Sequence, residues 1–184
     1  NSWLVKDIHQ ELKSWGHPGG CQSKFILNSN GDPAIVAVRE ALAKCHGGIV
    51  IPEQPTPGEH HGNGLAEVTG RHVRDHARVF KLYLKTKIAR EITNDEHIMA
   101  WLVRWAAMSM SRFQKGRAGR IPYQRQKGRT CELEVVPFGE KVLYAVPPAD
   151  KHGKLCKNEP RFEFGIFIGV HSKSGTAMLC TLEG

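Results

Sequence analysis

The chain has 184 residues, of which 40% are hydrophobic and 24% are charged, so it has enough apolar sequence for a core. These proportions exclude a disordered tail, a collagen-like repeat and a disulfide-stabilised miniprotein. The five cysteines are odd in number and contain no Cys-x-x-Cys pair, so neither a disulfide framework nor a zinc ribbon is expected. No apolar run reaches the roughly 18 to 20 residues of a membrane span, and no signal peptide opens the chain. The sequence therefore predicts a soluble, intracellular protein that is not secreted and has no membrane contact.

Positive charge is in excess and is clustered. The formal net charge is +8 and the isoelectric point is about 9.4. Residues 63–90 hold seven basic and two acidic residues, and residues 112–129 hold seven basic and no acidic residues. A general need for solubility explains a net charge but not this clustering, so a polyanionic partner such as nucleic acid is expected.

Apolar periodicity and turn residues predict the elements of the first half of the chain. A helix is expected over 3–15, a strand over 24–29 and a second helix from Pro33 to about Lys44, with Asp32 as its cap. A short strand follows at 49–51, then a Pro- and Gly-rich loop at 52–62 and a long helix over about 63–87. This order indicates α/β architecture with parallel or mixed strands. Only two strands precede residue 63, so the sheet looks truncated.

The second half has a different pattern. A long helix is expected over about 94–113, and the segment 112–129 reads as a basic stretch that either follows DNA or is a solvated linker. Short β-like runs follow at 138–144, 162–170 and 177–182. These observations divide the chain into a partial α/β core at 1–92, a helical extension and basic linker at 93–130, and a small β module at 131–184.

One face of the long helix over 63–87 combines a single acid with a row of bases. At about 100° per residue, five basic residues fall within about 40° of Glu67; they are Arg71, Arg74, Arg78, Lys81 and Lys85. Such a face is either an ordinary solvated surface, in which Glu67 pairs with Arg71, or a surface for a phosphate backbone. Five bases without an intervening acid favour the phosphate backbone.

Two motifs lie on either side of the loop at 52–62. Ser29-Asn30-Gly31-Asp32-Pro33 follows a predicted strand, and Asn63-Gly64-Leu65-Ala66-Glu67 opens the long helix, with 36 residues between Asn30 and Glu67. The motifs and their spacing resemble the integrase core of retroelements. Further blocks are similar to the Ty1/copia type of retrotransposon polyprotein; they are Trp101-Leu102, Ser111-Arg112-Phe113, Ile121-Pro122-Tyr123-Gln124, Phe138-Gly139 and Gly165-Ile-Phe-Ile-Gly169.

This resemblance implies the C-terminal part of a ribonuclease H-like integrase core, and an ancestral activity of metal-dependent polynucleotidyl transfer into DNA. Such chemistry uses two divalent metals about 4 Å apart, and Mg²⁺ prefers carboxylate oxygens. In the family three acids hold Mg²⁺ or Mn²⁺. Glu67 matches the last of them, Asn30 stands in the place of the second, and the first has no counterpart in this sequence. Asp32 is either a substitute ligand or the cap of the helix that follows.

Other candidate residues have simpler interpretations. His60 and His61 beside Glu59 could ligate a metal, but neighbouring histidines point in different directions and a polar loop is favoured. Cys45-His46 reads as a helix end. Trp101 and Trp105 are expected in the core rather than as platforms for stacked bases.

The sequence therefore predicts a retrotransposon-derived integrase fragment that is catalytically inactive as it stands. The resemblance implies a nuclear location and DNA as the partner, and it allows a homo-oligomer. Glu67 would be the metal ligand, and the five bases that share its face would contact the DNA backbone. A non-catalytic DNA-binding or assembly module is the alternative function, and a decayed reading frame with an unpaired sheet edge is a third hypothesis.

Overall fold

The computed structural model describes residues 2–17, 23–54, 56, 62–146, 161–172 and 174–181. In these ranges the chain is a mixture of helices and small sheets, so the predicted α/β class is confirmed at that level. The chain forms two compact units, Asn1–Arg71 and His72–Gly184. None of the helices described is both long and apolar enough to cross a lipid bilayer.

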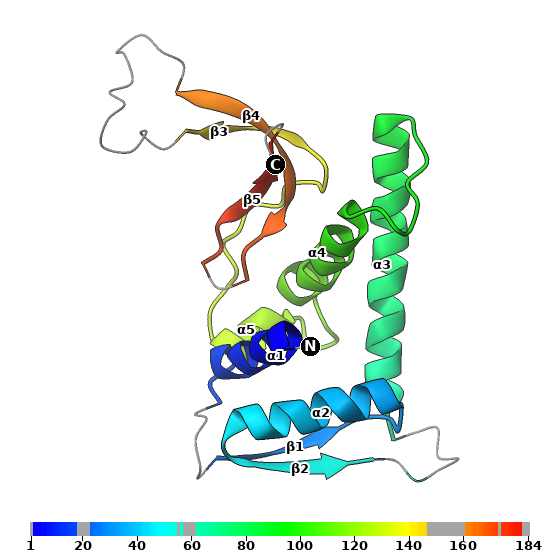
Figure 1. Cartoon of the computed structure of the whole chain (residues 1–184). Helices are drawn as coiled ribbons and strands as arrows, with labels where there is room; N and C mark the ends of the chain where they lie inside the picture. The colour runs from blue at the N-terminus through cyan, green and yellow to red at the C-terminus, as the bar shows by residue number, and fades with distance from the viewer. Residues whose placement is uncertain are drawn as a thin grey trace, which may run out of the picture. The chain divides into compact units, whose positions relative to one another are not determined.

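The N-terminal unit contains two helices and two strands in alternation. These are α1 (Ser2–Ser14), β1 (Lys24–Asn28), α2 (Pro33–His46) and β2 (Ile49–Glu53), followed by the first turns of a long helix (Figure 1). Strands β1 and β2 are parallel, with Lys24 opposite Ile49 and Asn28 opposite Glu53. Each of these elements lies where the periodicity predicts it. The connection through α2 is the crossover that two parallel strands require.

Helix α2 begins and ends on residues suited to those positions. The Asp32 side chain accepts a hydrogen bond from the Ala34 amide at 2.8 Å, and Pro33 occupies the first turn. This bond satisfies one of the backbone donors that every helix start leaves free. Gly47 ends the helix with φ of 69°, a left-handed conformation that glycine adopts without strain. The capping role predicted for Asp32 is therefore confirmed.

The two faces of the β1–β2 sheet differ in exposure. Phe25 and Val50 are opposite one another and half-buried, and Phe25 packs edge-on against the ring of His46 in α2. The other face carries three exposed isoleucines, which are Ile26, Ile49 and Ile51 at 62%, 57% and 41% exposure. Helix α2 therefore covers only one face of this sheet.

The C-terminal unit is built around a single hydrophobic core. Its elements are the larger part of α3 (Gly64–Ile88), α4 (Ile98–Phe113), α5 (Pro122–Lys127), β3 (Lys141–Ala145), β4 (Phe162–Val170) and β5 (Ala177–Cys180). The strands form an antiparallel sheet in the order β3-β4-β5. Ala77 and Leu84 of α3, Leu102 and Trp105 of α4 and Phe167 of β4 belong to one buried cluster. The three predicted β runs thus pack on the helices that precede them.

A tight turn before β3 packs closely against α3. Gly139 has φ of 78°, and a Cβ atom at this position would lie only 2.5 Å from the Leu84 side chain. The neighbouring backbone is tied to β4, because the Gly139 amide donates to the Phe167 carbonyl at 2.8 Å. Glycine is required at this position both for its conformation and for the close approach.

Helix α4 begins four residues later than the predicted start at 94. The Glu96 side chain accepts from the Thr93 amide at 2.8 Å and pairs with Arg90, which holds residues 90–96 in a loop. Helix α5 lies within the segment that the sequence analysis treated as a basic stretch. Its first residue is Pro122, and the Gln124 side chain accepts from the Ile121 amide at 3.2 Å.

Candidate nucleic-acid interface

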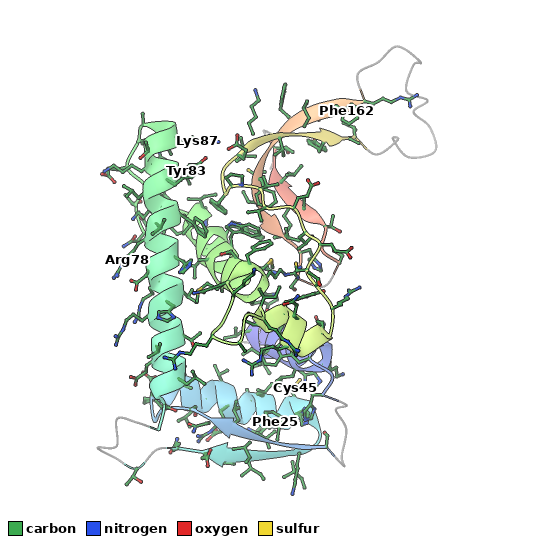
Figure 2. All side chains as sticks on the ribbon, turned by 180° about the vertical axis from the view of Figure 1, so that it is seen from behind. Phe25, Cys45, Arg78, Tyr83, Lys87 and Phe162 are labelled. Atoms are coloured by element: carbon green, nitrogen blue, oxygen red, sulfur yellow. The ribbon has the colours of Figure 1, made fainter. Side chains whose placement is uncertain are left out.

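Helix α3 presents the predicted row of bases on a side that is separate from its buried side. Ala77 and Leu84 are buried, whereas Glu67, Arg71, Arg74, Arg78 and Lys85 are exposed and Lys81 is half-buried. Arg78 is seen in Figure 2 on the side of α3 that faces away from α4. This surface, consisting of Arg71, Arg74, Arg78, Lys81 and Lys85, is called the basic face below.

Two members of the basic face have no partner among the described residues. Arg71 and Arg74 are exposed, and neither forms an ion pair or a side-chain hydrogen bond in the described part of the chain. They are one helical turn apart, so both guanidinium groups lie on the same side of α3. An unpaired, fully ionised guanidinium presents five donors in a fork that matches a phosphate group.

The other three bases have partners within the chain. Arg78 pairs with Asp75 at 2.8 Å, with side chains 76% and 52% exposed. Lys81 donates to the Asn94 side chain at 2.8 Å, and Lys85 pairs with Glu91. Exposed pairs of this kind contribute little to stability, about 0 to 1 kcal/mol, so an external phosphate can compete for these cations.

The end of α3 and the loop after it carry two further cations that are held by carboxylates. A hydrogen bond from Lys87 to Glu140 raises the pKa of Lys87 above its ordinary value, and the attraction of the Glu140 charge adds to this effect. The hydrogen bonds of Arg90 to Glu96 raise the pKa of Arg90 in the same way. Lys87 thus connects the end of α3 to the residue before β3, and Arg90 holds the loop after α3. Both contribute less free charge than Arg71 and Arg74.

The residues of the candidate catalytic set lie at one end of the N-terminal unit. Asn30 is exposed in the loop between β1 and α2, Asp32 caps α2, and Glu67 is exposed in the first turn of α3. Figure 1 shows the arrowheads of β1 and β2 and the first turn of α2 on the same side of this unit as the start of α3. The carboxyl ends of parallel strands are where α/β sheets place their ligands.

The residues at this end do not fit a two-metal carboxylate site. Glu67 is a carboxylate with no ion pair or side-chain hydrogen bond to another described residue, but Asn30 is an uncharged amide, and Asp32 uses Oδ1 to cap the Ala34 amide. Among the described residues, no group of three His, Cys, Asp or Glu side chains is placed to hold a metal. A pair of Mg²⁺ ions requires more negative charge than one carboxylate supplies.

The structure describes the positions of some of the other candidate residues but not of all. Glu59, His60 and His61 lie outside the described residues. Trp105 is 3% exposed and packs edge-on against Phe167, and Trp101 is half-buried beside the same cluster, so the predicted core role of both is confirmed. Cys45 is exposed in the last turn of α2.

Two charged residues have roles that the sequence analysis did not assign. Asp75 lies beside the basic face and neutralises Arg78, which the spacing of three residues could have indicated. Arg112 is only 9% exposed at the end of α4. It follows Trp105 by seven residues, which puts it on the apolar side of the helix, and this spacing is the sequence feature that could have indicated its burial.

No protein-family model and no curated protein matches the chain.

Proposed function

We propose that this protein binds the phosphate backbone of DNA through the basic face of α3, without catalysing a reaction on it. The observation that carries the proposal is the pair Arg71 and Arg74, which are exposed and free of acidic partners among the described residues. Contacts between basic side chains and phosphates depend strongly on salt and carry no sequence information by themselves.

We further propose that the chain derives from a retroelement integrase with a ribonuclease H-like core, and that it acts in the nucleus. The motifs around Asn30 and Glu67 support this origin, as does the parallel β1–α2–β2 arrangement that precedes α3. Asn30 in place of a carboxylate supports the loss of metal-dependent strand transfer, because an amide offers no charge to a divalent cation. The basic face does not use the residues of that metal site, so the loss of metal binding leaves DNA binding through this face intact.

The proposed function is tested by measuring the binding of the full chain to a fluorescent DNA duplex by anisotropy at several salt concentrations. The variant is Arg71→Gln with Arg74→Gln, and the matched control is Lys24→Gln with Lys44→Gln, which removes equal charge from exposed positions in β1 and α2. We expect the wild-type chain to lose affinity steeply with salt, and the slope of log K against log salt to fall by about 2 in the α3 variant.

The control distinguishes DNA binding through the basic face from attraction of DNA by the net charge of the whole chain. Its salt slope should stay within error of the wild type, and a chelator should leave all affinities unchanged. Equal loss of affinity in the two double variants would show that net charge alone attracts DNA. Binding that does not respond to salt would also contradict the proposal.

A further inference from the structure

A buried arginine side chain, that of Arg112, lines a pocket in the C-terminal unit. Arg112, in the last turn of α4, is 9% exposed, and its Nη2 donates to the Ser172 carbonyl at 3.0 Å. The guanidinium carbon of Arg112 also lies 5.2 Å from the centre of the Tyr123 ring, within the range of a cation–π contact. A guanidinium stays charged in a protein, so burying one is costly unless its donors are used.

The donors of Arg112 are only partly used by the chain. Arg112 has five N–H groups, and the hydrogen bond to Ser172 uses one of them. No carboxylate pairs with it in the described part of the chain. None of its side-chain nitrogens is a buried atom without a partner, so the donors that form no hydrogen bond within the chain are reached by solvent, and Arg112 lines a pocket.

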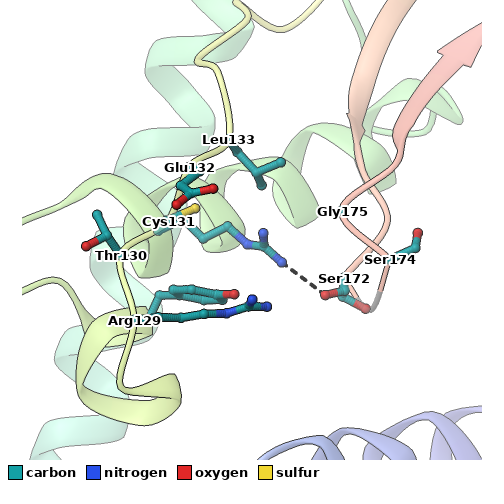
Figure 3. A pocket seen from close by; sticks show the side chains of 10 residues that line it. Arg129, Thr130, Cys131, Glu132, Leu133, Ser172, Ser174 and Gly175 are labelled. Carbon is teal, nitrogen blue, oxygen red and sulfur yellow. Dashed lines mark hydrogen bonds between the residues drawn. The ribbon is translucent and has the colours of Figure 1, made fainter.

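The pocket has a volume of about 260 Å³, and its other polar lining favours an anion. Arg129 contributes a second guanidinium to the lining, and Figure 3 shows the Arg112–Ser172 hydrogen bond dashed. The Thr130 hydroxyl accepts from the Gln124 side chain at 3.4 Å and points away from the two guanidinium groups (Figure 3). Glu132 is the only acid among the described residues of the lining, so two cations oppose one anion.

We propose that this pocket binds one phosphate group, held by the guanidinium groups of Arg112 and Arg129. Two guanidinium forks match the tetrahedral oxygens of phosphate, and bonds between ionised partners are about twice as strong as neutral ones. The volume is below the roughly 300 to 1,000 Å³ of sites that enclose a whole drug-sized ligand, so it suits a small anionic group. The phosphate is either free or part of a nucleic-acid strand; in the second case the inference rests on the proposed function.

The test uses the full chain and follows backbone amide signals by NMR during titration with inorganic phosphate. The pocket variant is Arg129→Gln, which removes an exposed guanidinium that no described contact ties to the fold. Arg112→Lys keeps the buried charge but loses the planar fork. The matched control is Arg104→Gln, which removes an exposed arginine of α4 that does not line the pocket.

We expect saturable shifts at Cys131, Leu133 and Ser174 in the wild-type chain and in the control. Phosphate affinity should fall about tenfold in Arg129→Gln and in Arg112→Lys, because each loses a charge-assisted contact. Absence of saturable shifts in the wild-type chain, or equal loss in Arg104→Gln, would overturn the proposal.

A second titration identifies the source of the phosphate. A single-stranded oligonucleotide that shifts the pocket signals, and is displaced by inorganic phosphate, identifies the strand as the ligand. Shifts with inorganic phosphate but not with the oligonucleotide identify a free phosphate. The chain with Arg71→Gln and Arg74→Gln should keep its phosphate shifts, so failure of the DNA-binding proposal is distinguishable from failure of this one.

Discussion

Asp32 and Glu67 are both exposed acids of the N-terminal unit, but their surroundings assign them different roles. Asp32 is bound to the Ala34 amide, and removing a cap of this kind costs about 0.5 to 2 kcal/mol. Glu67 forms no ion pair or side-chain hydrogen bond with another described residue, and it lies in the first turn of α3, where a negative charge interacts favourably with the helix dipole. Replacing Glu67 therefore breaks no described contact, which suits a test for a lapsed metal site.

Restoring a carboxylate at residue 30 tests the proposed integrase origin. We expect the wild-type chain to bind Mn²⁺ too weakly to detect by calorimetry, because Asn30 supplies no charge beside Glu67. The Asn30→Asp variant should bind Mn²⁺ measurably, and adding Glu67→Ala should abolish the gain. Circular dichroism of each variant is measured first, to check that the variant is folded.

The matched control for this experiment is Glu40→Ala in the Asn30→Asp background. Glu40 is an exposed acid of the same unit that lies in the middle of α2, away from the carboxyl ends of the strands. Its removal should leave Mn²⁺ binding in place. Binding by Asn30→Asp that persists without Glu67 would mean that the two positions never shared a metal, and the assignment of Glu67 would fail.

At the scale of elements, one face of the β1–β2 sheet is apolar and exposed. Ile26, Ile49 and Ile51 lie together on it, and among the described residues neither outer edge of this two-stranded sheet is paired with another strand. Apolar patches and free strand edges both favour association between chains.

We expect the wild-type chain to associate as its concentration rises, and Ile26→Lys with Ile51→Lys to remain monomeric in sedimentation velocity experiments. The control is Leu65→Lys with Val135→Lys, which adds the same charge at two exposed apolar residues outside the sheet. The control should associate like the wild type. A monomeric wild-type chain, or equal dissociation in both variants, would show that this face does not self-associate.

Most helices and strands could be predicted because their signals are local. Asp32 followed by Pro33 marks the start of α2, and Gly47 marks its end. The late start of α4 could not be predicted, because it depends on which groups hydrogen-bond to the Glu96 side chain in the folded chain. The burial of Arg112 depends on a hydrogen bond to a carbonyl sixty residues further along the chain, so the pocket emerges only in the folded unit.

The basic face was only partly predictable for a similar reason. The row of bases follows directly from the helical repeat, which is fixed by geometry. Their free or paired state depends on the positions of Asn94 and Glu91, which lie in the loop that follows α3. Sequence spacing alone therefore could not separate Arg71 and Arg74 from Lys81 and Lys85.

At the scale of the whole molecule, a buried histidine in the N-terminal unit leads us to expect that the two units respond differently to acid. His46 is 4% exposed in the N-terminal unit, its Nε2 lies 3.0 Å from the Ser23 hydroxyl, and the rings of His9 and His17 pack against it. Burial lowers the pKa of His46 below its ordinary value of 6.5, and the charges of His17, His9 and Lys13 lower it further.

A lowered pKa in the folded state makes stability depend on pH with a definite sign. Between the lowered value and about 6.5 the unfolded state binds more protons than the folded state, so the free energy of unfolding rises with pH. The contribution of neutral His46 is fully present above about pH 6.5 and is lost as the pH falls toward the lowered value. Acid should therefore loosen the N-terminal unit, in which α1 packs on α2.

Hydrogen exchange of backbone amides measures each unit separately in the intact chain. After correction for intrinsic rates, we expect the opening free energies of α1 and α2 to be lower at pH 5.5 than at pH 7.5, and those of α4 and β4 to be equal. The His46→Gln variant should lose this pH dependence, whereas His97→Gln, at an exposed residue before α4, should keep it. An equal decrease in both units would mean that the net charge of the chain, rather than the buried His46, weakens the fold in acid.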